Sequence, residues 1–336
     1  MTPAAAKSRL GAVVGLAQGL LWVPGMKPLL FASLFWVACV APDEDLVAAG
    51  GIDGPEYAQA SDGKADGAAM GRTVRLQIDH PAFTPPSGKP GVVVYVPRHF
   101  DATPPVNVVV FLHGFYNCVD NVLGTRNTPC RAGGPARQAY SLAAQLEATH
   151  KNALLILPET TVDAASSDPG RLGDDGGFAT LLDETLTQLD LGIDLGDVGR
   201  VVVATHSGGH HAAASIAQHG GIDVSELYLL DSLYAEYDDF DAWVQQDPAG
   251  FGGTVPARRF ASVYSQTAGT LVANQAMATR AKGWVSDAAV LVDDRTTNTL
   301  SDGKLGKGLV WKRSGLSHDG IPRYYFGKLL ATSGLR

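Results

Sequence analysis

The sequence has little of several features that define common classes of protein. It contains only three cysteines in 336 residues, so at most one disulfide can form within the chain. It has no basic stripe, and its net charge of −8 argues against nucleic acid or an anionic lipid surface as a partner. A hydrophobic fraction of 45% excludes global disorder. These features describe a globular chain long enough to bury a sizeable core.

The amino-terminal segment lacks acidic residues and has no clear membrane-spanning run. The apolar run that follows Met26 is about 13 residues long, whereas a spanning helix needs roughly 20, so it is typical of a signal peptide. The run ends in "WVAC" at Cys39, which resembles a bacterial lipoprotein cleavage box, although Trp36 departs from the usual residue. We therefore expect export, lipidation of Cys39 and a true start at either Met1 or Met26.

Composition divides the chain into three segments. Residues 1–41 are the expected targeting segment; a single uncleaved anchor over residues 10–41 is the alternative, but "PGMKP" interrupts it with proline and charge. Residues 42–71 are acidic and rich in glycine and alanine, as in a flexible linker. Residues 72–336 are expected to form the folded domain.

Cys118 and Cys130 lie in one predicted loop, "NCVDNVLGTRNTPC". Two cysteines about a dozen residues apart in an exported protein favour a disulfide. Two free thiols are the alternative.

From residue 73 onward, predicted strands alternate with predicted helices. The strand segments are 73–78, 91–97, 106–115, 153–159, 198–207, 225–231, 258–265 and 307–314. The helical segments are 133–150, 178–190, 208–220, 270–283 and 321–332. This alternation predicts an α/β fold with a mainly parallel sheet and helices on both faces.

The segment "VVVATHSGGHH" places Ser207 where a buried strand meets a helix. The pattern G-x-S-x-G marks a serine nucleophile pushed out of a sheet by a sharp turn; here Thr205 replaces the first glycine. Ser207 is therefore a candidate nucleophile. A serine that only caps the following helix is the alternative.

Two further segments complete a candidate hydrolytic site. "FLHGF" ends the strand expected beside the Ser207 strand, so the backbone N–H groups of Phe115 and Gly208 could stabilise an oxyanion. His113 is expected to bond to backbone and shape this loop. His318, in the loop before the last helix, is the candidate general base; a solvated loop histidine is the alternative.

The motifs "VVFLHGF", "ATHSGG", "LYLLD" and "SHDGIP" occur in an order that resembles the α/β-hydrolase family over residues 73–336. The resemblance implies a serine nucleophile, an acid and a histidine in that chain order. Ser207 and His318 match directly. The strand at which the family usually places its acid ends here in "VYSQTAG", without a carboxylate. Asp231, which ends "LYLLD" one strand earlier, lies at a location that some family members use, so the resemblance favours it as the acid. The rival carboxylates are Glu236, Asp238, Asp239, Asp293 and Asp294.

A zinc site is a weaker alternative for the same region. His206 and His210 have a spacing that can ligate zinc on one helix face, and His211 is adjacent. However, His206 is expected in the turn, and no H-E-x-x-H pattern is present.

These observations predict an exported serine hydrolase that cleaves carboxylic esters without a cofactor or metal. Its expected partner is a small-molecule or polymer ester, with membrane contact only through a lipid anchor at Cys39. The loop over residues 116–134 is expected to form a stiff wall over the site. A peptidase of the same fold and a surface-anchored, non-catalytic binding protein are the alternatives.

Overall fold

The computed structural model describes residues 70–85, 89–160, 168–266 and 268–336. The predicted targeting segment, Cys39 and nearly all of the predicted linker lie outside these described residues. Within the described ranges, no helix is both long enough and apolar enough to cross a membrane.

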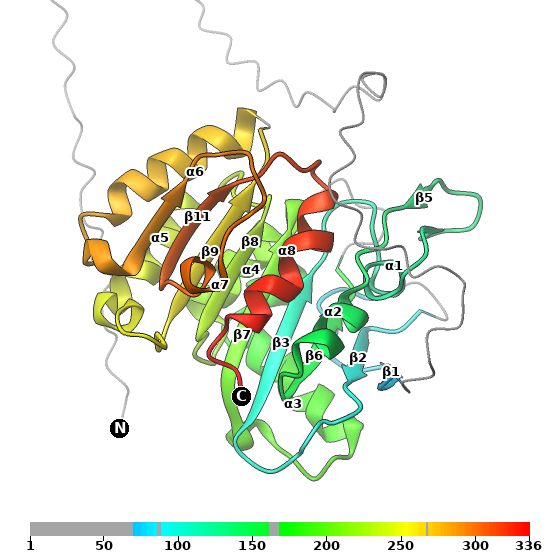
Figure 1. The fold of residues 1–336 in the computed structure, drawn as a ribbon. Coiled ribbons are helices and arrows are strands. Elements are labelled where there is room, and N and C mark those ends of the chain that lie inside the picture. Colours follow the sequence, from blue (N-terminus) through cyan, green and yellow to red (C-terminus); the bar gives the residue numbers. More distant parts are fainter. Residues whose placement is uncertain (1–69, 86–88, 161–167, 267) are drawn as a thin grey trace, which may run out of the picture. The chain divides into compact units, whose positions relative to one another are not determined.

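A nine-stranded sheet forms the centre of the folded domain, in the order β1-β2-β6-β3-β7-β8-β9-β11-β10 (Figure 1). β2 pairs antiparallel with β1 and β6, and the remaining neighbours pair in parallel. The strands are β1 (Arg72–Leu76), β2 (Val92–Val96), β3 (Val106–Leu112), β6 (Ala153–Pro158), β7 (Val198–His206), β8 (Glu226–Leu230), β9 (Arg259–Tyr264), β10 (Val290–Asp293) and β11 (Leu309–Arg313).

The sheet separates two hydrophobic cores, because successive side chains of a strand point to opposite faces. In β3, Val108 and Val110 belong to one core, whereas Val109 and Phe111 belong to the other. The first core includes α3 (Gly177–Leu189), α4 (His210–His219), α5 (Tyr237–Gln246) and α6 (Ala268–Ala281). The second includes α1 (Val119–Leu123), α2 (Leu142–Thr149), α7 (Asp302–Leu305) and α8 (Gly320–Ala331). The predicted mainly parallel sheet with helices on both faces is thus confirmed.

Three details differ from the sequence-based expectation. The helix predicted over residues 133–150 begins only at Leu142, because Ser141 has a left-handed backbone with a φ of +58°. The residues before it contribute β5 (Ala136–Arg137), which pairs with β4 (Thr128–Pro129). α1, α5, α7 and β10 were not predicted, since none of them carries a long apolar period.

The predicted disulfide between Cys118 and Cys130 is confirmed, with the two Cα atoms 5.7 Å apart. Cys118 directly precedes α1, and Cys130 follows β4. The bond therefore ties the start of α1 to the small β4–β5 ribbon. Asn121 supports this connection, because its Oδ1 accepts a hydrogen bond from the Thr128 backbone N–H at 3.0 Å.

We expect the double substitution Cys118→Ala/Cys130→Ala to lower the free energy of unfolding by about 3 kcal/mol, since the cross-link restricts a short loop of the unfolded chain. Urea unfolding of the variant, beside oxidised and reduced wild type, measures this. The reduced wild type should resemble the variant. A variant as stable as the oxidised wild type would contradict the expectation.

Candidate active site

Three segments of the predicted site follow the carboxyl ends of neighbouring parallel strands. β3 leads into the His113 loop, β7 into Ser207 and β8 into Asp231. β3 lies beside β7, and β7 lies beside β8, so these three exits are adjacent on one edge of the sheet. Ligand sites of open α/β sheets form at this edge.

Ser207 occupies a sharp corner between β7 and α4, with a left-handed backbone φ of +51°. Gly209 is required at this corner, because a Cβ there would lie 2.3 Å from Thr205 Oγ1 and 2.9 Å from the Leu112 carbonyl oxygen. The hydroxyl of Ser232 donates to the Ser207 carbonyl at 2.7 Å and braces the turn. The backbone at Ser207 therefore has the geometry of a nucleophile elbow.

His318 and Asp231 form the charged half of the site. The Nδ1 of His318 lies 2.8 Å from Asp231 Oδ2, and the Asp231 residue is fully buried. The other carboxylate oxygen accepts hydrogen bonds from the Ser265 N–H and the Thr270 hydroxyl, both at 2.9 Å. Burial raises the pKa of Asp231, but the hydrogen bonds from His318 and Ser265 outweigh burial and lower it. Asp231 is therefore an ionised acceptor, and His318 donates from Nδ1.

The His318 ring lies against His206, the residue that immediately precedes Ser207, with ring centroids 4.3 Å apart. This contact places the His318 ring beside the residue that leads into the elbow. Within the described residues, the Ser207 hydroxyl makes no hydrogen bond, so Ser207 and His318 are not bonded in this structure. Apo hydrolytic sites commonly tighten this bond when substrate binds.

His206 is held in place by a buried polar chain. Tyr140 donates its hydroxyl proton to Asp319 Oδ1 at 2.8 Å, so its oxygen accepts from His206 Nδ1 at 2.9 Å. Burial lowers the pKa of His206 well below its usual value, and the nearby His318 lowers it further. His206 is thus a neutral ring that supports one face of His318.

The predicted oxyanion donors lie at the same corner. A Cβ on Gly114 would lie 2.6 Å from the Ser207 Cβ, and a Cβ on Gly208 would lie 2.4 Å from the Phe115 ring. The backbone of the loop after β3 therefore touches the elbow directly. The Phe115 ring packs against Gly208, so the two residues predicted to supply the donors are neighbours.

The rival carboxylates have other partners or positions. Glu236 pairs with His211, and Asp294 accepts a hydrogen bond from Tyr264 at 2.8 Å. Asp293 binds Arg295 at 2.8 Å. Asp238 and Asp239 lie in the first turn of α5. Of the predicted acids, Asp231 is the one that the structure places on His318.

The three histidines of the zinc alternative point to different partners. His210 donates from Nδ1 to the Ser207 carbonyl at 3.1 Å, whereas His211 pairs with Glu236 and His206 with Tyr140. Among the residues that the structure describes, no cluster of three histidine, cysteine or acidic side chains could hold a metal ion.

Sequence reasoning missed two buried residues that support the site. Tyr140 is buried beneath His206, and Glu159 binds the His113 ring at 2.7 Å. Glu159 directly follows β6, the strand beside β3. A carboxylate at the end of an apolar strand was a usable signal, whereas nothing local marks Tyr140.

Comparison with protein-family models gives no match, and comparison with curated protein sequences also gives none. Solved structures do match. A structure of FAE has a TM-score of 0.51 and 10% identity, covering 79% of this chain and 88% of that one. The feruloyl esterase module from Clostridium thermocellum, as a mutant complexed with sinapinate, has a TM-score of 0.50 and 9% identity over the same shares. At this identity the likeness establishes the fold alone: the chain has the α/β-hydrolase fold, as predicted.

Acid sensitivity of folding should depend on His210. Burial lowers its pKa to about 4, from an ordinary value of 6.5. The unfolded chain therefore takes up a proton between pH 6.5 and 4 that the folded chain resists, so stability falls as the pH falls through this window. Across the whole window, His210 should lower the free energy of unfolding by about 3 kcal/mol.

Urea unfolding of His210→Asn at several pH values tests this, with the exposed residue His150→Asn as control. The His210 variant should lose less stability than wild type between pH 6.5 and 4. The pKa of His206 is also lowered, so the His210 variant should keep part of the fall in stability with falling pH. Equal slopes for wild type and the His210 variant would refute the assignment.

Proposed function

We propose that this protein is a serine hydrolase that cleaves carboxylic esters through an acyl-enzyme. The observation that carries the proposal is the His318–Asp231 hydrogen bond, with the His318 ring beside a left-handed elbow that presents Ser207. A nucleophile, a base and an orienting acid in this relation define the serine-hydrolase mechanism. The proposal is supported by the α/β-hydrolase fold, in which Ser207, Asp231 and His318 all follow carboxyl ends of parallel strands in one sheet.

In the first half-reaction, His318 Nε2 accepts the hydroxyl proton of Ser207 while Oγ attacks the ester carbonyl carbon. Asp231 keeps the Nδ1 proton on His318 and stabilises the imidazolium that forms. The carbonyl electron pair moves onto the oxygen, and the N–H groups of Phe115 and Gly208 donate hydrogen bonds to the oxyanion that forms. Collapse of this intermediate breaks the carbon–oxygen bond, and the departing alkoxide takes the proton from His318.

In the second half-reaction, water replaces the alcohol. His318 removes a proton from water as the oxygen attacks the acyl carbon of the Ser207 ester. The tetrahedral intermediate uses the same two N–H donors. Its collapse returns the proton to Ser207 Oγ and releases the carboxylic acid, so the enzyme is regenerated without a cofactor.

Ser207→Ala should abolish labelling by a fluorophosphonate probe and lower ester turnover at least about 1,000-fold, since the covalent step is lost. His318→Ala should lower both similarly, because serine then lacks its base. A panel of short-chain to long-chain acyl esters, with matching amides, measures the activity. Labelling with amide but not ester turnover would favour a peptidase, and no Ser207-dependent labelling would refute the proposal.

Asp231→Asn should lower kcat by about 1,000- to 10,000-fold, because an amide no longer selects the proper His318 tautomer. Asp238→Asn is the matched control, since this carboxylate is exposed on the first turn of α5. Steady-state kinetics on the best ester measures both. Comparable losses in the two variants would place the acid elsewhere.

We also propose that the protein is exported and anchored by lipidation of Cys39. The Cys118–Cys130 disulfide supports export, because such bonds persist in oxidising compartments. Metabolic lipid labelling of the wild type beside Cys39→Ser distinguishes an anchored protein from a released one.

A further inference from the structure

The peptide unit between Gly114 and Phe115 has its carbonyl fixed on one side. The Gly114 oxygen accepts hydrogen bonds from His113 Nδ1 at 2.9 Å and from the Asn117 N–H at 3.4 Å. The second bond closes a β-turn in which Tyr116 has a φ of +60°. The carbonyl is therefore directed into the loop.

The N–H of Phe115 belongs to the same peptide unit and points the opposite way, because C=O and N–H are antiparallel in a trans peptide. In the described part of the chain, this N–H has no acceptor within the protein. The loop touches the elbow at Ser207 and Gly208. An unbonded donor at that place is available to a developing oxyanion.

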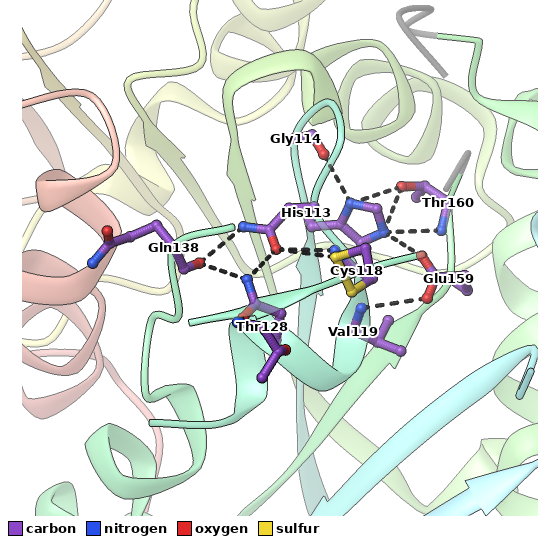
Figure 2. The surroundings of a disulfide bond; sticks show 11 residues. His113, Gly114, Cys118, Val119, Thr128, Gln138, Glu159 and Thr160 are labelled. Carbon is purple, nitrogen blue, oxygen red and sulfur yellow. Dashed lines mark hydrogen bonds and ion pairs between the residues drawn. A yellow bond between two sulfur atoms is a disulfide. The ribbon is translucent and has the colours of Figure 1, made fainter. Parts of the chain in front are cut away.

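His113 is itself held by a buried carboxylate, as Figure 2 shows. Its Nε2 lies 2.7 Å from Glu159 Oε1, and both side chains are at most 3% exposed. The Thr160 hydroxyl and N–H also approach the same nitrogen, at 3.0 and 3.4 Å, but the shorter contact to the carboxylate determines its role. A carbonyl oxygen at Nδ1 and a carboxylate at Nε2 both accept, so both ring nitrogens donate.

Electrostatics agree with this geometry. Burial alone lowers the pKa of His113, but attraction to the Glu159 carboxylate and the hydrogen bonds to Glu159 and Gly114 raise it above the ordinary value. The raised pKa favours the protonated ring. A charge-assisted bond to the Gly114 carbonyl is stronger than a neutral one and polarises the peptide, which strengthens its N–H as a donor.

Glu159 links the His113 ring to the segment that carries the disulfide. Its Oε2 accepts from the Val119 N–H at the start of α1 at 3.3 Å, and Val119 follows Cys118 (Figure 2). The backbone N–H of Glu159 binds the Gly91 carbonyl at 2.9 Å. Glu159 is thus fixed from three directions.

We propose that His113 and Glu159 are positioning residues for the oxyanion site. His113 donates to Glu159 and to the Gly114 carbonyl at once, and so keeps the Phe115 N–H directed at the oxyanion that forms on Ser207. Neither side chain touches substrate. The catalytic consequence rests on the proposed function, whereas the arrangement of protons on His113 does not.

The double variant His113→Leu/Glu159→Leu tests the consequence. Replacing a buried ion pair by apolar side chains of similar size commonly preserves stability, whereas one substitution alone would leave a buried charge. We expect kcat to fall about 10- to 100-fold with KM within about 2-fold, because the lost alignment matters only when the oxyanion forms. A cooperatively folded double variant with wild-type kcat would overturn the proposal.

His80→Leu/Glu184→Leu is the matched control. This second histidine–glutamate pair joins the segment after β1 to α3, and its histidine is half-exposed. Its replacement should leave kcat and KM unchanged. A loss of kcat equal to that of the buried double variant would show that removing any such pair suffices, and would overturn the assignment.

Nitrogen-15 NMR of the histidine rings in Ser207→Ala gives a readout that needs neither turnover nor the double variant. We expect His113 to carry protons on both ring nitrogens at pH 7, unlike the buried neutral rings of His206 and His210. A His113 ring with one bare nitrogen would overturn the proposal whatever the activity. Absence of Ser207-dependent turnover in wild type would instead refute the proposed function, and the NMR result would still decide the proton arrangement.

Discussion

The site depends on the left-handed backbone of Ser207. A non-glycine residue in this conformation costs about 1–2 kcal/mol, so the surroundings must hold it there. They do so by close contact: neither Gly114, Gly208 nor Gly209 has space for a Cβ. Thr205 stands where the usual pattern has glycine, and its Oγ1 fills the space that Gly209 leaves. The elbow is therefore stabilised by packing from two strands and not by its own sequence alone.

A second left-handed residue, Asp231 with a φ of +49°, turns the acid toward His318. β9 lies between β8 and β11, so the loop that carries His318 must reach across β9 to meet Asp231. The end of β9 has no carboxylate at the position usual for the acid. It instead supplies the Ser265 N–H that binds Asp231, and nearby Thr270 supplies a hydroxyl. The same region of the site is thus used to orient the acid rather than to provide it.

Two buried polar chains flank the candidate site. Tyr140 and Asp319 hold His206 as a neutral ring against His318, and Glu159 holds His113 behind the Gly114–Phe115 peptide. Burial lowers the pKa of both histidines. At His206 the net pKa is lowered, whereas at His113 the Glu159 carboxylate outweighs burial and the net pKa is raised. The Cys118–Cys130 disulfide stiffens the loop to which Glu159 is hydrogen-bonded.

The sequence by itself determined most strands and helices, the disulfide and the position of Ser207, because apolar periodicity and glycine spacing are local. It also indicated His318 through its position after the last strand, and Asp231 through the resemblance to α/β-hydrolases. Only the tertiary structure decided which carboxylate lies on His318, since that bond joins residues 87 positions apart. The same holds for Glu159 with His113 and for Tyr140 with Asp319, which are 46 and 179 positions apart. Such pairs follow from the order of strands in the sheet, which local patterns do not encode.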